Sequence, residues 1–320
     1  MRNDALLLAV LAVTYGCGAE PETAAVDTQI ESSAPEQDLP DRIVAERGGF
    51  IPEGVEYDPV NGRLLTGSLS EGTVFQIHPD GRVTPAVTDS GLVSSVGIEV
   101  DTVGNRLLVA NSDRGAFDGS SRGQAKLGVY NLSTGERLAM VDLAASIPNR
   151  PADATHFAND VAVSEDGTAY VTDTMQNVIY RVTPGYEASV LHRFEPIEGL
   201  GLNGIVYHPS GYLIVAGGST LYKVPVADPS TTSQVMLPEA VEGQDGMVWM
   251  PDGRLAITSN SQSRVVALTS NDDWATAQVA GIAPFEGQGT TAAVVGNDVY
   301  VVQPHFADQD PPTIERAIFP

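Results

Sequence analysis

Residues 159–172 read Asn-Asp-Val-Ala-Val-Ser-Glu-Asp-Gly-Thr-Ala-Tyr-Val-Thr, and this stretch carries the pattern that decides the fold. A polar residue heads an alternating apolar segment, a turn follows at Asp166-Gly167, and a second apolar segment begins. Gly and Asn tolerate the positive φ angles that tight hairpin turns need. The stretch therefore predicts two antiparallel β-strands joined by a short turn.

The same pattern recurs five more times. Related segments begin at Glu53, Gly97, Asn203, Asp245 and Thr291. The spacing is 44 residues from Glu53 to Gly97 and 42 residues from Asn203 to Asp245. Third strands follow at 73–78, 178–182, 220–224 and 264–268, and weaker fourth strands at 83–87 and 188–192. A strand repeat of about 45 residues is typical of a β-propeller, whose blades have four strands.

We therefore predict an all-β fold over residues 42–320, a six-bladed β-propeller with four-stranded antiparallel blades. The first and last blades must be joined, and either 42–45 or 313–318 could complete the neighbouring blade. The spacing between the second and third segments grows to about 62 residues because of extra residues at 111–124 and 144–156. Insertions in repeat folds usually lie on one face, so we expect both to border the channel entrance.

Equivalent positions of successive blades converge on the central channel of a propeller. Glu53, Asn159, Asn203 and Asp245 head four of the segments, so we expect their side chains to meet. Carboxylate and amide oxygens are ligands for a hard divalent cation. The alternative is that each residue caps a turn at a strand end, but four in register favour a shared site.

Four short motifs carry a resemblance to a known family: Pro52-Glu53-Gly54, Asn159-Asp160, Asn203-Gly204 and Asp245-Gly246. The set resembles the SMP-30/gluconolactonase/LRE (regucalcin-like) family of six-bladed propellers. The resemblance implies one divalent cation held by Glu53, Asn203 and Asp245, with Asn159 as a further ligand or a substrate contact. It implies Ca²⁺ first, with Mn²⁺, Mg²⁺ and Zn²⁺ as alternatives, and it implies hydrolysis of lactones or related esters.

The expected chemistry assigns different roles to these side chains. A cation in the ring would polarise a lactone carbonyl, and Asp245 would accept a proton from the attacking water as the catalytic residue. His156 and His305 are further candidates for substrate binding at the channel mouth, with an ordinary surface position as the alternative for His305. Enzymes of the family often carry an arginine where this chain has Phe157, so carboxylate recognition by that arginine is absent.

Two other readings of the sequence are excluded. Residues 119–123 read Gly-Ser-Ser-Arg-Gly and match the G-x-S-x-G pattern of serine hydrolases, but they lie in a polar insertion without the strand–elbow–helix context. The formal net charge of −24 and the pI near 4.3 leave no basic face for nucleic acid.

The amino-terminal residues indicate export. Residues 5–13 form an apolar run behind Arg2, and Cys17, the single cysteine of the chain, follows directly. Residues 1–17 thus resemble a lipoprotein signal with Cys17 as the lipidation site; a plain signal peptide is the alternative. Residues 18–41 are rich in Ala, Glu, Pro, Thr and Ser, which predicts a disordered tether. We expect a lipid-anchored or periplasmic protein of the bacterial envelope.

Two functions from different classes remain open at this point. The first is a metal-dependent hydrolase of small-molecule lactones or esters, acting as a monomer. The second is a non-catalytic extracytoplasmic propeller that binds a protein, peptide or glycan on its rim. An isomerase or lyase on the same scaffold is a weaker third reading, because the fold does not fix the function.

Overall fold

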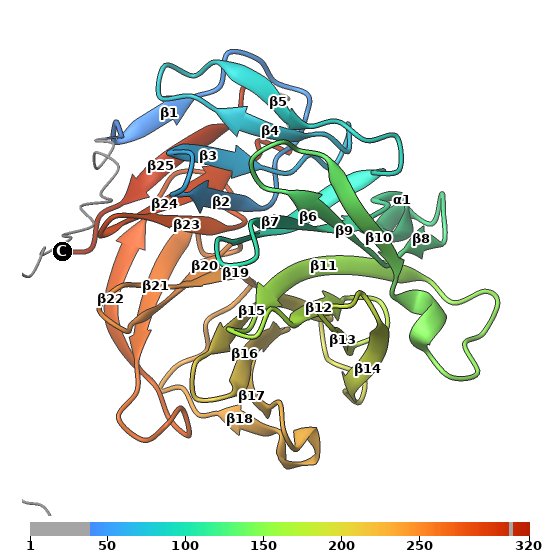
Figure 1. Ribbon diagram of the computed structural model, residues 1–320. Helices are drawn as coiled ribbons and strands as arrows, with labels where there is room; N and C mark the ends of the chain where they lie inside the picture. The colour runs from blue at the N-terminus through green and yellow to red at the C-terminus, as the bar shows by residue number, and fades with distance from the viewer. Residues whose placement is uncertain (1–38, 307–309) are drawn as a thin grey trace, which may run out of the picture. The chain divides into compact units, whose positions relative to one another are not determined.

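The alternating segments fold as the repeat predicts: six sheets surround a common axis in the computed structural model, which describes residues 39–306 and 310–320 (Figure 1). The first strands of neighbouring sheets contact one another, so these strands line the axis. This arrangement confirms the six-bladed β-propeller. The predicted signal segment, Cys17 and nearly all of the predicted tether lie outside the described residues.

The first five blades follow the chain in order from the inside outward. Blade 1 consists of β2 (Val55–Asp58), β3 (Arg63–Thr66), β4 (Val74–Ile77) and β5 (Val83–Val87). Blade 2 consists of β6 (Ser94–Asp101), β7 (Arg106–Ser112), β9 (Lys126–Asn131) and β10 (Arg137–Asp142). Blade 3 consists of β11 (His156–Val163), β12 (Ala169–Asp173), β13 (Val178–Val182) and β14 (Ala188–Arg193). Blade 4 consists of β15 (Leu202–His208), β16 (Tyr212–Gly217), β17 (Thr220–Pro225) and β18 (Ser233–Val235), and blade 5 of β19 (Gln244–Trp249), β20 (Leu255–Ser259), β21 (Arg264–Thr269) and β22 (Gln278–Pro284).

Blade 6 closes the ring with strands from both ends of the domain. It consists of β23 (Ala292–Val295), β24 (Asp298–Gln303), β25 (Thr313–Ala317) and, as its outermost strand, β1 (Arg42–Val44). Ile43 pairs with Ile314 across the junction. Both segments that the sequence offered for closure are therefore used, side by side in one sheet.

The closure makes a specific stability prediction. Ile43 is only 2% exposed and belongs to the apolar cluster between blades 6 and 1, whereas the next residue, Val44, is 50% exposed. We expect Ile43→Ala to lower the free energy of unfolding by about 2–4 kcal/mol, the usual cost of truncating a buried isoleucine. Val44→Ala should change it by less than about 0.5 kcal/mol. Urea unfolding of both variants measures this, and equal effects would contradict the closure.

The first insertion adds short elements beside blade 3. α1 (Gly115–Asp118) is followed by β8 (Gly123–Gln124), which runs parallel to the start of β11 and makes this blade five-stranded. Phe117 of α1 packs edge-on against Phe157 with ring centroids 4.6 Å apart. The second insertion contains η1 (Ala144–Ser146), and a similar turn, η2 (Pro229–Thr231), precedes β18. The first insertion thus covers the inner strand of blade 3 at the end where Asn159 lies.

Apolar side chains hold neighbouring blades together. The buried residues form six clusters, and each cluster fills the interface between two adjacent blades; the cluster between blades 2 and 3, for example, contains Leu127 and Tyr180. Close packing of this kind fixes the inner strands relative to one another.

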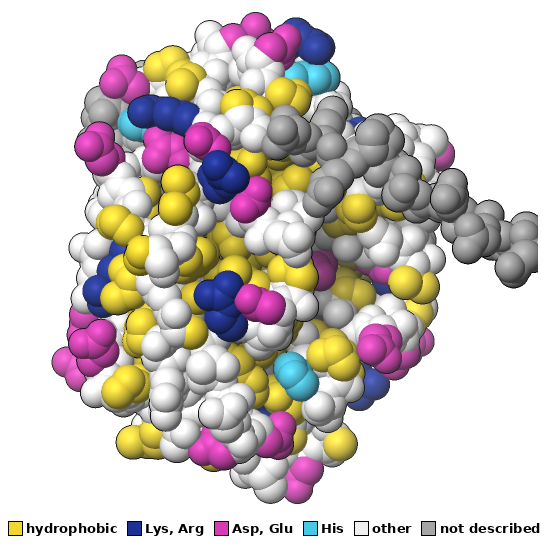
Figure 2. Space-filling model, turned by 90° about the vertical axis from the view of Figure 1, so that its left-hand side faces the viewer, with side chains coloured by type: hydrophobic (Ala, Val, Ile, Leu, Met, Phe, Trp, Pro, Cys, Tyr) yellow, Lys and Arg dark blue, Asp and Glu magenta, His cyan; other side chains and the backbone are white. Residues whose placement is uncertain are grey.

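The surface carries few basic side chains. Figure 2 shows one side of the molecule, on which Lys and Arg side chains are scattered among acidic and apolar ones without forming a continuous basic patch. Among the residues that the structure describes, no helix has the length and apolar character needed to cross a bilayer.

Candidate functional site

A β-bulge interrupts the inner strand of four blades at the same level of the channel. The pairing with the second strand shifts between Ser95 and Ile98, between Ala158 and Val161, between Leu202 and Ile205, and between Gln244 and Met247. Bulges re-aim side chains and are common beside functional sites. Three of the predicted site residues lie in these bulges: Asn159, Asn203 and Asp245. The bulges therefore mark the start of the alternating segment in these repeats.

Hydrogen bonds join neighbouring inner strands at this level. Gly54 donates to the carbonyl of Val96 at 3.1 Å, and Gly246 donates to the carbonyl of Thr290 at 2.8 Å. The hydroxyl of Thr290 in turn donates to the carbonyl of Glu53 at 2.7 Å, joining blade 6 to blade 1. These contacts draw the inner strands close around the axis.

The residue after each ring position is glycine in four blades because the strands approach so closely. A Cβ atom at Gly204 would lie 2.2 Å from the carbonyl oxygen of Asp245, and one at Gly97 would lie 2.4 Å from a carboxylate oxygen of Asp160. Asp160 itself stands where four other blades have glycine. Its carboxylate accepts the N–H groups of Val161 at 2.9 Å and Ile205 at 3.1 Å, which ties blade 3 to blade 4.

The crowding around Asp245 can be tested. Gly204→Ala would place a methyl group against the backbone of Asp245, so we expect a loss of about 1–3 kcal/mol in unfolding free energy and displacement of Asp245. The matched control is Gly185→Ala, whose new Cβ would meet nothing closer than 3.7 Å. Urea unfolding compares the two variants. Equal stability would contradict the close approach of blades 4 and 5.

The four predicted ring residues are buried. The exposed fractions are 8% for Glu53, 5% for Asn159, 4% for Asn203 and 9% for Asp245. Asn260 donates to the Oδ2 atom of Asp245 at 3.4 Å and to the carbonyl of Gly289 at 3.0 Å.

Two oxygens of the ring have no partner. The Nδ2 atom of Asn159 donates to the hydroxyl of Thr174 at 2.9 Å, and that hydroxyl donates to the carbonyl of Leu202 at 2.6 Å. The amide of Asn159 is thereby oriented, and its Oδ1 atom is buried without a hydrogen bond, as is the Oε2 atom of Glu53. Buried acceptors without a donor are costly, so they call for a ligand.

The carboxylates of the ring lie near enough to perturb one another. Burial raises the pKa of Glu53 well above its ordinary value, and the negative charges of Asp245 and Asp160 raise it further. Burial raises the pKa of Asp245 to about 8, with a hydrogen bond from Asn203 opposing and the charge of Asp160 adding to the rise. Glu53, Asn203 and Asp245 are thus brought together, as the sequence predicts, with Asp160 as an additional member. The signal in the sequence for Asp160 was an aspartate at the position where four other repeats have glycine.

A second group of carboxylates lies farther along the inner strands. Glu56 and Glu99 line, together with Asp160, a cavity of about 230 Å³ whose wall includes Tyr207 and Trp249. Burial raises the pKa of Glu56 to about 8 and that of Asp160 to about 7, and it also raises the pKa of Glu99, which the charge of Glu56 raises further. The channel therefore carries carboxylates both in the ring and in the cavity beyond it.

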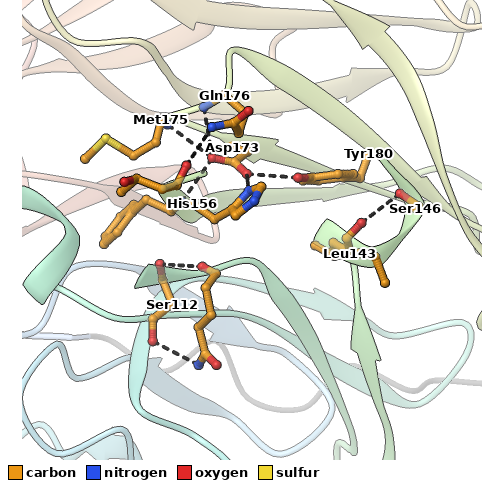
Figure 3. Close-up of polar contacts among 12 residues, drawn as sticks. Ser112, Leu143, Ser146, His156, Asp173, Met175, Gln176 and Tyr180 are labelled. Carbon is orange, nitrogen blue, oxygen red and sulfur yellow. Dashed lines mark hydrogen bonds and ion pairs between the residues drawn. The ribbon is translucent and has the colours of Figure 1, made fainter. Parts of the chain in front are cut away.

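His156 is the first residue of β11 and is tied to its own blade, as its contact with Asp173 in Figure 3 shows. Its Nδ1 atom contacts the Oδ2 atom of Asp173 at 2.9 Å, and the hydroxyl of Tyr180 donates to that oxygen at 2.9 Å. The other carboxylate oxygen of Asp173 accepts three backbone N–H groups, those of residues 157, 175 and 176. His156 is 3% exposed, and its Nε2 atom is buried without a hydrogen bond. His305 follows β24 at the same end of blade 6, with a left-handed backbone (φ 55°).

The donor set of the ring is mixed. In residues 39–306 and 310–320, no group of three or more His, Cys, Asp or Glu side chains is spaced to hold a metal ion. The ring combines the carboxylates of Glu53 and Asp245 with the amides of Asn159 and Asn203. Such oxygen donors fit Ca²⁺ better than Zn²⁺, which favours nitrogen and sulfur.

Comparisons with known proteins relate the chain to other propellers. No protein-family model and no curated protein matches the sequence. Among solved structures, the major allergen Mala s 1 of Malassezia sympodialis superposes with a TM-score of 0.74 at 17% identity, covering 88% of this chain and 96% of that one. A calcium-binding protein named regucalcin, from Agrobacterium tumefaciens, gives 0.61 at 18%, covering 88% and 94%. A protein assigned as a gluconolactonase gives 0.60 at 16%, covering 87% and 93%. The resemblance inferred from the four motifs is thus confirmed at the level of the fold.

Proposed function

We propose that this protein is a divalent-cation-dependent hydrolase of lactones or related esters, of the SMP-30/gluconolactonase-like kind. One observation carries the proposal: Glu53 and Asn159 present buried oxygens without hydrogen-bond partners in the ring that also holds Asn203 and Asp245. The fold likeness to proteins named regucalcin and gluconolactonase supports it.

The ring residues fit a cation of charge 2+. Glu53, Asn203 and Asp245 would hold it, with Asn159 as a further ligand, and Ca²⁺ is the ion that this oxygen set suits best. When bound, the ion supplies charge that polarises the carbonyl of the substrate. Two carboxylates balance its charge while the neutral amides leave coordination positions for substrate.

The side chains supply the remaining chemistry. Asp245 accepts the proton of the attacking water as the general base. Asn260 keeps its carboxylate in place through the contact at 3.4 Å. Thr174 fixes the amide of Asn159 so that its oxygen, not its nitrogen, is free for a ligand. His156 and His305 remain candidates for substrate binding, and the hydrogen bond of His156 to Asp173 restrains its ring.

A second candidate function is a non-catalytic propeller that binds a protein, peptide or glycan on its rim. Phe157 favours the rim-binding propeller. At this position enzymes of the SMP-30/gluconolactonase/LRE family often have an arginine, whereas here the phenylalanine packs on Phe117. That propeller would bind its ligand equally with and without a chelator.

Localisation and assembly remain proposals from the sequence. We propose export to the bacterial envelope with a lipid anchor at Cys17, and a monomeric state without a nucleic-acid partner.

The test is a metal analysis of the purified protein followed by a panel of lactones and esters with and without EDTA. The hydrolase requires a bound divalent cation, hydrolysis of at least one lactone, and loss of that hydrolysis on chelation with recovery on addition of Ca²⁺. Hydrolysis that survives EDTA would remove the cation from the proposal. No hydrolysis by cation-loaded protein would favour the rim-binding propeller.

A further inference from the structure

A pocket of about 440 Å³ opens between blades 4 and 5 next to the ring. Asn203 and Asp245, two residues of the ring, line it, so a molecule bound there would reach the candidate site directly. Small-molecule sites commonly have volumes of about 300–1,000 Å³. The pocket is therefore large enough for the part of a substrate that extends beyond the reacting carbonyl.

The walls of this pocket are hydrogen-bonded loops. Gly218 donates to the carbonyl of Leu200 at 2.9 Å, and Asn260 donates from its backbone to the carbonyl of Gly243 at 2.9 Å. Gly243 has a φ of 59° and packs so closely on Ser261 that a Cβ atom would lie 2.4 Å from its hydroxyl. The loops are tied down, so the pocket is preformed.

The burial of the Gln244 side chain in this pocket is not explained by contacts within the protein. It lines the pocket one position before Asp245, and its side chain is 3% exposed. Both its Nε2 and its Oε1 atoms are buried without a hydrogen-bond partner. A primary amide that lacks both a donor and an acceptor partner is costly to bury unless a ligand supplies them.

The side chains that line the pocket carry no positive charge. None of them is basic, and Glu198 and Asp245 are acidic. Away from the cation of the ring, an anionic substituent would therefore lose its hydration without gaining an ion pair with a side chain. The complementary group is uncharged and offers one donor and one acceptor side by side, as a carboxamide or a vicinal diol does.

We propose that Gln244 determines substrate specificity by pairing its amide with such a neutral donor–acceptor group on the substrate. The inference rests on the proposed lactone or ester hydrolase and names the class of substrate it would take. Gln244 recognises the substituent, while Glu53, Asn159, Asn203 and Asp245 act at the reacting carbonyl.

Binding of lactams, which resist hydrolysis, tests this independently of turnover. Calorimetry in the presence of Ca²⁺ would compare four γ-lactams: unsubstituted, acylamino-substituted, dihydroxylated and carboxylated. We expect the protein to bind the acylamino or the dihydroxylated lactam about tenfold more tightly than the unsubstituted one, and the carboxylated lactam no more tightly than the unsubstituted one. Whichever of the two binds tightly identifies the group that Gln244 recognises.

Gln244→Met, which keeps the length of the side chain, should reduce that preference to less than about twofold. The matched control is Gln234→Met on the exposed outer strand β18, which should keep it. A preference that persists in Gln244→Met, or tighter binding of the carboxylated lactam by the unaltered protein both with Ca²⁺ and in EDTA, would overturn the assignment. The second result needs no variant, so it decides even if Gln244→Met does not fold.

Hydrolysis of the matching lactones separates the two proposals. Selective binding that depends on Gln244, without hydrolysis of any lactone, would refute the hydrolase but leave the recognition site. Hydrolysis that EDTA abolishes, with no preference among the lactams, would support the hydrolase and refute the role of Gln244.

Discussion

Asp245→Asn is expected to lower lactone hydrolysis by a factor of at least about 10² while making the cation-free protein more stable at pH 8. The loss of rate follows because an amide cannot accept the proton of the attacking water, a role that typically contributes 10²–10⁴-fold. The variant is nearly isosteric, so the geometry of the ring should be preserved. Initial rates with saturating Ca²⁺ measure the first effect.

The gain in stability follows from the pKa of Asp245. In the unfolded chain an aspartate ionises near pH 4, whereas burial raises the pKa in the folded protein to about 8. Between these values the folded state holds the extra proton, so the stability contributed at low pH is lost as the pH rises from about 4 to about 8. Asp245→Asn has no carboxylate to ionise, so the cation-free variant should exceed the unaltered protein at pH 8 by up to about 5 kcal/mol.

Urea unfolding in EDTA at pH 5 and pH 8 measures the second effect. Asp252→Asn is the matched control, because Asp252 lies in the exposed turn of the same blade and bonds to Arg254. It should leave hydrolysis unchanged and bring no gain in stability at pH 8. A variant at Asp245 that keeps its rate would exclude this residue as the proton acceptor.

The repeat made the fold predictable because each blade contributes the same pattern of strand, turn and strand. The position of the ring along the inner strands could also be inferred from the sequence. Asn203-Gly204 and Asp245-Gly246 each combine a candidate site residue with the glycine that the close approach of inner strands requires. Which terminal segment completes the closing blade was not predictable, because pairing of β1 with β25 depends on contacts between the two ends of the domain.

The acidic groups beyond the ring could not be identified from the sequence. Glu56 and Glu99 sit in strands whose alternation does not reveal which side chains face the channel and which face the neighbouring blade. The sequence also could not show that the Gln244 amide lacks hydrogen-bond partners. This depends on how the surrounding loops pack, since a glutamine beside Asp245 could equally bond to a nearby loop. His156 looked like a residue of the channel mouth, and its contact with Asp173 depends on the pairing of β11 with β12.

The channel contains five buried or half-buried carboxylates with raised pKa values, so we expect cation binding and pH to be strongly linked. At pH 5.5 the carboxylate of Asp245 holds a proton that a cation must displace, and at pH 8.5 it is ionised to a far greater extent. Since a pKa of about 8 lies about 2.5 units above pH 5.5, affinity for Ca²⁺ should be on the order of 100-fold weaker at the lower pH.

The linkage between pH and cation binding also predicts how much Ca²⁺ stabilises the folded protein at each pH. At a free Ca²⁺ concentration about 100 times the dissociation constant measured at pH 8.5, the cation should add about 2.7 kcal/mol to the unfolding free energy. The same concentration should add less than about 0.5 kcal/mol at pH 5.5. Urea unfolding at the two pH values, with and without Ca²⁺, measures both.

Two matched variants locate the cation along the channel. Glu53→Gln and Glu56→Gln each remove one carboxylate with a raised pKa, and each should reduce the loss of stability that the cation-free protein suffers as the pH rises above about 4.5. Only Glu53→Gln should also abolish the stabilisation by Ca²⁺ at pH 8.5, because Glu53 belongs to the ring and Glu56 lines the cavity beyond it. If Glu56→Gln removed the effect of Ca²⁺ and Glu53→Gln kept it, the cation would sit among the deeper carboxylates, and the assignment of the ring as the reacting centre would be wrong.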